Sequence, residues 1–122
     1  MQSRESHWVI RGGIVTPEQL ANGASPLPDE PGLCQISVAA QAGRSIEELA
    51  AASRFPNRQI GVTTREALVA AGAIDVRETP GRNPVHGDII VPCGPEGSVA
   101  ETLLEALAAV FLQRATPSRG PL

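Results

Sequence analysis

Two residues able to carry acid–base chemistry stand close together in the segment TPGRNPVHGDIIVP, residues 79–92. His86 is one of only two histidines in the chain of 122 residues, and Asp88 follows it two positions later. Alternate residues of a strand share one face, so these two side chains are expected roughly 6.5–7 Å apart along it. They can share a ligand or a water molecule, and the aspartate can fix the tautomer of the histidine. The simpler interpretation is a histidine at a loop edge beside a solvated aspartate, and the sequence alone favours it.

Two further polar side chains lie on strands predicted earlier in the chain. Arg11, in HWVIRGG, shares a strand face with Val9, and Ser37, in LCQISVA, points away from the apolar face of its strand. If the strands are neighbours and these faces line a cleft, Arg11 and Ser37 converge with His86 and Asp88 on one ligand. The alternative is a two-layer fold whose polar sheet face is simply exposed to water, which requires no function.

Four copies of the pattern S/T-x-x-E/Q predict the starts of four helices. In this capping box the hydroxyl accepts from the third helical amide, and the Glu or Gln side chain reaches back to the amide of the cap. The copies span Thr16–Gln19, Ser45–Glu48, Thr63–Glu66 and Ser98–Glu101. Gly23 and Gly72 are predicted left-handed caps of the first and third helices, and Pro56 ends the second. The last helix, from Val99 to about Gln113, is predicted to be the longest and to pack an apolar stripe across a sheet.

Strands are predicted between these helices at residues 7–15, 33–40, 59–62, 73–78 and 85–91, the last two joined as a hairpin. The fold class that follows is α+β. We expect a small mixed, mainly antiparallel sheet with a long C-terminal helix and two or three short helices packed on it. A doubly wound α/β fold is the alternative, but the strands are few and several connections are short. Residues 7–114 are expected to form a single domain between flexible ends at residues 1–6 and 115–122.

Composition argues against several functional classes. The net charge is −3, and the ten basic residues, all arginine, are scattered without a basic stripe, so we expect no binding to nucleic acid. No segment is apolar for long enough to span a membrane. The N-terminus lacks the apolar core of a signal peptide, and a cytoplasmic location is therefore expected.

Metal and thiol chemistry have weak support in the sequence. Cys34 and Cys93 form neither a CxxC motif nor a zinc spacing. We expect both to be reduced and buried, and a disulfide between them stays open as an alternative. His7, His86 and Asp88 would hold a metal ion only if the first and last strands were neighbours, so no metal is expected.

The segment HWVIRGGIV resembles the first strand of ADP-ribosyltransferase-like domains, in which an arginine followed by glycine contacts NAD. A serine motif on a second strand and a polar residue on a late strand complete the pattern, and GLCQISV and HGDIIVP stand in those places here. The resemblance implies a small bacterial effector or toxin domain that uses NAD, in an active or a degenerate form. Arg11, followed by Gly12, would clamp the pyrophosphate, and Ser37 would bind the nicotinamide ribose. His86 or Asp88 would stabilise the positive sugar or orient the acceptor.

A non-catalytic protein-interaction module, such as an immunity, antitoxin or adaptor protein of a bacterial system, is the alternative function. It predicts an exposed apolar or acidic patch that binds a protein partner. A homo-oligomer would follow if the apolar stripe of the last helix lay open to a second copy of the chain.

Overall fold

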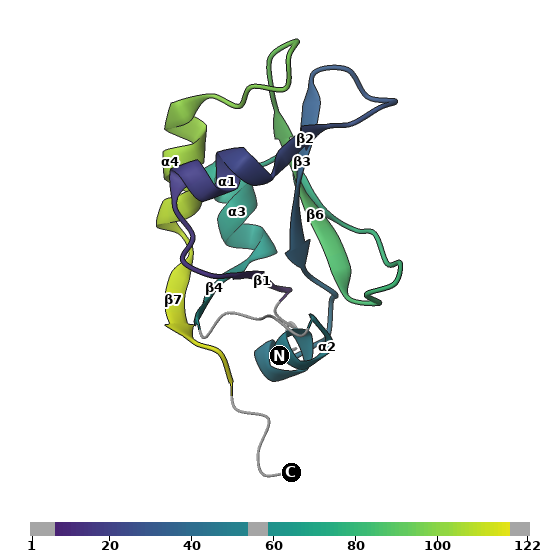
Figure 1. The fold of residues 1–122 in the computed structure, drawn as a ribbon, viewed down its shortest axis with the longest axis vertical. Helices are drawn as coiled ribbons and strands as arrows, with labels where there is room; N and C mark the ends of the chain where they lie inside the picture. The colour runs from purple at the N-terminus through teal and green to yellow at the C-terminus, as the bar shows by residue number, and fades with distance from the viewer. Residues whose placement is uncertain (1–6, 54–58, 118–122) are drawn as a thin grey trace, which may run out of the picture.

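The structure is a computed structural model that describes residues 7–53 and 59–117. Within them the strands are β1 (Trp8–Gly12), β2 (Ala24–Pro26), β3 (Leu33–Ala39), β4 (Gln59–Thr64), β5 (Asp75–Glu78), β6 (His86–Pro92) and β7 (Leu112–Ala115). The helices are α1 (Pro17–Gly23), α2 (Ile46–Ser53), α3 (Arg65–Ala71) and α4 (Glu101–Ala109). The predicted α+β class and the hairpin of β5 and β6 are confirmed, and all the strand pairings of these residues are antiparallel (Figure 1).

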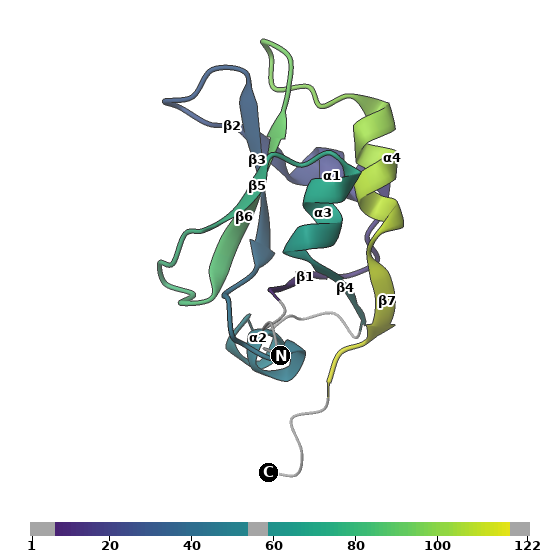
Figure 2. The same cartoon turned by 180° about the vertical axis from the view of Figure 1, so that it is seen from behind.

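Two strands, β2 and β1, pair with different stretches of the same edge of β3, and this divides the sheet into two parts. Its order is β5-β6-β3-β1-β4-β7, and β2 pairs with β3 beside this path. The β2 pairing ends at Ile36, whereas β1 meets β3 only through the pair of Ile10 with Ala39. Ser37 and Val38 therefore lie on a stretch of this edge that no described strand covers. In Figures 1 and 2, β3 and β6 run together on one side of α3, while β7 lies on its other side.

Two apolar clusters hold the helices on the sheet. The larger cluster joins one face of β3 and β6 to α1, α3 and α4, and includes Leu20, Cys34, Ile36, Leu68, Ile89, Val91, Leu104 and Leu107. The smaller cluster packs Leu49 of α2 against Ile10 and Ile60. Because Leu104 and Leu107 are buried here, the apolar stripe of the last helix faces the core and is not open to a second copy. Burial of these side chains supplies most of the driving force for folding.

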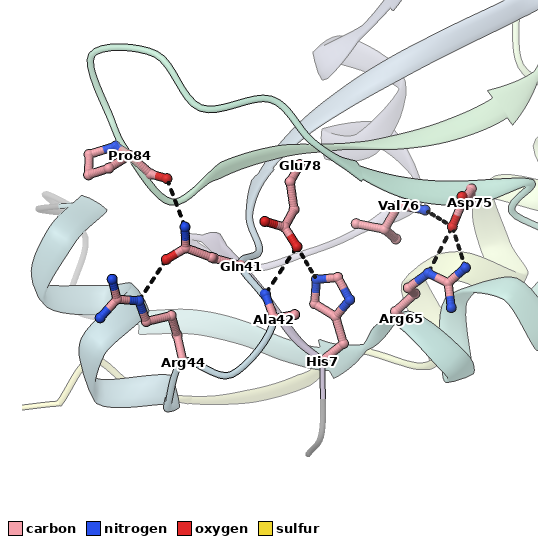
Figure 3. Close-up of polar contacts among 9 residues, drawn as sticks. All are labelled: His7, Gln41, Ala42, Arg44, Arg65, Asp75, Val76, Glu78 and Pro84. Atoms are coloured by element: carbon pink, nitrogen blue, oxygen red, sulfur yellow. Dashed lines mark hydrogen bonds and ion pairs between the residues drawn. The ribbon is translucent and has the colours of Figure 1, made fainter. Parts of the chain in front are cut away.

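Polar contacts at the edge strand β5 also join the two parts of the sheet (Figure 3). Arg65, directly after β4, donates from Nε to Asp75 Oδ1 at 2.8 Å. The backbone amide of Val76, followed by Arg65, holds the pKa of Asp75 below its ordinary value. Glu78, at the other end of β5, lies 3.9 Å from Nε2 of His7, just before β1. Arg65, Asp75 and Glu78 are each more than a third exposed, so these contacts add little stability, but they fix where β5 lies relative to β1 and β4.

Three of the four predicted helix starts are present. Ser45 and Glu48 form a complete capping box, in which Ser45 Oγ accepts from the Glu48 amide at 3.0 Å and Glu48 Oε1 accepts from the Ser45 amide at 2.9 Å. Thr16 caps α1 with its side chain, as predicted. The third helix begins one residue later than predicted, because Thr63 is a buried residue of β4 and Thr64 is the cap.

The fourth predicted helix start is wrong. The N-cap of α4 is Ala100, which makes no side-chain cap, and the helix begins at Glu101. Ser98 is engaged in a turn instead, where its carbonyl oxygen accepts from the amide of Gly94 at 2.8 Å. This turn keeps the chain out of the helical conformation for two residues beyond the predicted cap.

The last helix also ends earlier than predicted, at Ala109, and has nine residues. Gln113, predicted to be its last residue, lies in β7 and contacts a distant segment of the chain. Its Oε1 accepts from the Val15 amide at 2.7 Å, and its Nε2 donates to the Gly13 carbonyl at 3.1 Å. Ala115, predicted to begin a flexible tail, pairs with Gln59. The short strand β2 lies between the first predicted helix and the strand predicted at residues 33–40, where the sequence predicted no strand.

Replacing Ser45 by alanine is expected to lower the free energy of unfolding by about 1 kcal/mol, because the change removes one half of a capping box. Ser98→Ala is the matched control. It makes the same change at a serine that caps no helix, and we expect it to stay within about 0.5 kcal/mol of the parent. Urea unfolding followed by circular dichroism measures both. Equal losses in the two variants would contradict this account of the caps.

Candidate functional site

A cleft on the polar face of β3 and β6 brings together four of the five predicted site residues. Its volume is about 300 Å³, and it is lined by Arg11, Gly12, Gln19, Ser37, Val38, Ala39, Ser53, Asn83 and His86. Strand β3 lies between β1 and β6, so the three strands that carry Arg11, Ser37 and His86 are direct neighbours. Asp88, the fifth predicted residue, does not line the cleft.

The guanidinium of Arg11 lies at the uncovered stretch of the β3 edge. Its Nε donates to Gln19 Oε1 at 2.8 Å, and one terminal nitrogen donates to the Ser37 carbonyl oxygen at 2.5 Å. A longer contact of 3.4 Å joins the second terminal nitrogen to the Gln19 carbonyl. The Ser37 carbonyl thus accepts from a side chain where an adjacent strand would otherwise donate an amide. Through these contacts Arg11 links β1, α1 and β3.

Arg11 has no acidic partner in the part of the chain that the structure describes. Within residues 7–53 and 59–117 no carboxylate lies at ion-pair distance from it, whereas Arg44, Arg65 and Arg77 each have a carboxylate partner. Burial lowers the pKa of the Arg11 guanidinium, which nevertheless stays charged at neutral pH. Three of its five N–H groups are engaged by neutral oxygens, which leaves two donors. Such a guanidinium is suited to a carboxylate or a phosphate.

Two residues that position Arg11 were missed in the sequence. Gln19 was predicted to reach back to the helix cap, but its Nε2 donates to the Gly12 carbonyl at 2.9 Å while its Oε1 accepts from Arg11. Gly23 was predicted to be a left-handed cap, but it is the last residue of α1 and its φ is not positive. A β-carbon at Gly23 would collide with the Arg11 guanidinium. Both roles depend on where β1 lies against α1, which no local pattern encodes.

Thr79, between β5 and β6, holds the ring of His86. Nδ1 of His86 lies 2.9 Å from Thr79 Oγ1 and 3.2 Å from the Thr79 carbonyl oxygen. The threonine hydroxyl donates its single proton to Asp88 Oδ2 at 2.9 Å, and a carbonyl can only accept. Nδ1 of the neutral ring therefore carries the proton, and Nε2 is the basic nitrogen.

Asp88 lies behind His86 and not in the cleft itself. It is 5% exposed and stands opposite Ser37 in the pairing of β3 with β6. Its Oδ1 lies 3.9 Å from His86 Nε2, an ion-pair distance when the ring is protonated. The two residues predicted to act together are thus neighbours, connected through Thr79. The simpler interpretation of a solvated aspartate is wrong, because Asp88 is buried.

Searches against protein-family models, curated proteins and solved structures found no match for the chain. Over the described ranges, no helix is both long and apolar enough to cross a bilayer. In the same residues no three or more His, Cys, Asp or Glu side chains are grouped as metal ligands.

Gly23→Ala is expected to destabilise the protein by about 1–3 kcal/mol, because the added methyl group displaces the Arg11 guanidinium. Helix propensity alone predicts the opposite sign, since alanine is favoured over glycine in a helix by about 1 kcal/mol. Gly81→Ala is the control, because no atom lies within 4 Å of a β-carbon at that position. Urea unfolding measures both variants. A stabilised Gly23→Ala variant would contradict the position of Arg11.

Thr79→Val is expected to leave the buried Asp88 carboxylate without its hydroxyl donor and to lower stability by about 1–3 kcal/mol. It should also weaken the preference for the proton on Nδ1 of His86, because Nδ1 keeps only the longer contact with the backbone carbonyl. Thr79→Ser retains the hydroxyl and serves as the control. Nitrogen chemical shifts of the His86 ring at neutral pH report which nitrogen is protonated. A parent protein with the proton on Nε2 would contradict the hydrogen-bond network.

Proposed function

We propose that the cleft binds NAD and that the protein is a small ADP-ribosyltransferase-like effector or toxin domain. The observation that carries the proposal is the unneutralised Arg11 guanidinium at the division of the sheet. The resemblance noted in the sequence requires an arginine, a serine and a late-strand polar residue to face one ligand. Arg11, Ser37 and His86 all line the same cleft, on three adjacent strands, which supports the proposal.

The cleft suits part of an NAD molecule. Its volume of about 300 Å³ is at the lower end of the range for small-molecule sites, roughly 300–1,000 Å³. One nucleoside half would occupy the cleft, and the other half would lie along its open rim. The two remaining N–H donors of Arg11 would bind the pyrophosphate. Ser37 is exposed, and its hydroxyl would bind the ribose.

The cofactor supplies an activated bond between nicotinamide and ribose, and the residues of the cleft would act around it. His86 stands on the late strand where the family pattern has a polar residue. The basic Nε2 of its neutral ring would accept a proton from the attacking acceptor. Asp88 would act as a positioning residue, because it contacts the ring through Thr79 and stabilises the charge of a protonated ring.

A protein-interaction module is the second candidate, and the outer edge of β7 favours it. All four residues of β7 are exposed, with Leu112 at 73%, and its pairing within the described residues is with β4 alone. An exposed edge strand can accept a strand from a partner protein. This surface is separate from the cleft, so the two functions make different predictions.

Arg11→Gln is expected to weaken NAD binding at least ten-fold, because it removes a charge-assisted contact worth about 1.5–3 kcal/mol. Arg77→Gln is the matched control, since Arg77 is paired with Glu30 and does not line the cleft. Isothermal titration calorimetry measures affinity, and chromatography of released nicotinamide measures turnover. His86→Ala should lower turnover more than affinity.

The Arg11 variant needs a folding control, because Arg11 also bridges three elements. Loss of the contacts with Gln19 and Ser37 is expected to lower the melting temperature measurably. Binding is therefore compared well below the melting temperature of each variant. Absence of binding at millimolar NAD, or equal losses in the Arg11 and Arg77 variants, would refute the proposal.

A further inference from the structure

The two cysteines of the chain come together at one end of β3 and β6. Cys34 on β3 stands opposite Val91 of β6, and the amide of Cys93 donates to the Gly32 carbonyl at 2.9 Å, which continues the contact between the two segments. The two sulfur atoms lie 2.6 Å apart, closer than the roughly 3.5–4 Å of ordinary non-bonded contacts. Both residues are free thiols in this structure.

The two thiols differ in their access to solvent. Cys34 is fully buried in the larger apolar cluster. Cys93 is half-buried and lines a separate cleft of about 340 Å³ with the residues that lead into α4. Burial, followed by the hydrogen bond with Cys93, raises the pKa of Cys34 to about 11. Cys34 is therefore protonated at neutral pH, and a reagent from solution meets Cys93 first.

We propose that Cys34 and Cys93 form a redox-active dithiol site that takes small disulfides, such as oxidised glutathione, as its oxidant. Cys93, as the thiolate, attacks one sulfur of the small disulfide, whose S–S bond breaks and releases one thiolate. Cys34 then gives its proton to solvent, and its sulfur attacks that of Cys93 and displaces the second thiolate. The two cysteines lose two electrons and two protons, and the oxidant becomes two thiols. This exchange is independent of the proposed NAD chemistry.

The new bond would connect β3 to the segment that leads into α4. It closes a loop of some sixty residues between Cys34 and Cys93, which restricts the unfolded chain more than the folded one. Because the folded state already holds the sulfurs together, little rearrangement is needed. We expect the melting temperature of the oxidised protein to exceed that of the reduced protein by roughly 10 °C.

The test exposes the folded full chain to oxidised glutathione and measures the intact mass before and after alkylation with N-ethylmaleimide. The parent is expected to lose the mass of two hydrogens, to retain no glutathione and to resist alkylation. Cys34→Ala should keep one glutathione on Cys93, because no second thiol can displace it. Cys93→Ala should remain unmodified, since Cys34 is buried. Dithiothreitol should reverse the change in mass and in melting temperature.

Several outcomes would overturn the proposal. A parent chain that keeps glutathione, or that stays open to alkylation at both cysteines, has no intramolecular exchange. A disulfide formed only between two chains would likewise contradict an intramolecular exchange between Cys34 and Cys93. Glutathione on Cys93→Ala would show that Cys34 is reached directly. Cys34→Ser is the second variant if Cys34→Ala does not melt cooperatively, and the same adduct on Cys93 is expected.

Discussion

Strand β3 has to serve two parts of the sheet along one edge, and the change of partner leaves the Ser37 carbonyl without a strand amide. A strand carbonyl that lacks a partner strand has to accept from a side chain or from water. Arg11 reaches from β1 to donate to it, and Gln19 of α1 holds the guanidinium in place while it also donates to the Gly12 carbonyl. The Arg11 side chain therefore connects β1 to α1 and to the uncovered edge of β3, and it places a positive charge there. Gly23 matters for the same reason, because a larger residue there would take the space of the guanidinium.

The two faces of β3 and β6 differ in polarity. One face carries Cys34 and Ile36 into the apolar core, so it must stay apolar. The other face carries Ser37, His86 and Asp88, and its polar groups are ordered by hydrogen bonds. The oxygens that accept from Arg11 are uncharged, so the positive charge of its guanidinium is not cancelled and still attracts an anion. A histidine with a fixed tautomer lies on the same cleft. Under the proposed function, Arg11 would be the binding group and His86 would be the base.

Local patterns predicted most of the elements but not the contacts between distant segments. The side-chain caps at Thr16 and Ser45 and the alternation of β3 encode local hydrogen bonds and faces, so they could be recognised in the sequence. The edge strand β7 and the early end of α4 could not, because Gln113 is held extended by the backbone of residues 13–15. The alternation of the strands also indicated that Arg11, Ser37 and His86 could converge, and they line one cleft. The roles of Gln19, Gly23 and Thr79 were not predicted, since each depends on the packing of one element against another.

The most direct test of the central claim is a titration of the ¹⁵N-labelled protein with NAD, followed by two-dimensional NMR of the backbone amides. If the unneutralised Arg11 guanidinium is the anchor of an NAD site, the amides of Gly12, Ser37 and His86 should shift together along one saturable binding curve. The same titration of Gly23→Ala, in which the guanidinium is displaced, should shift them much less. Shifts confined to other surfaces, or no shift at millimolar NAD, would contradict the account of the cleft.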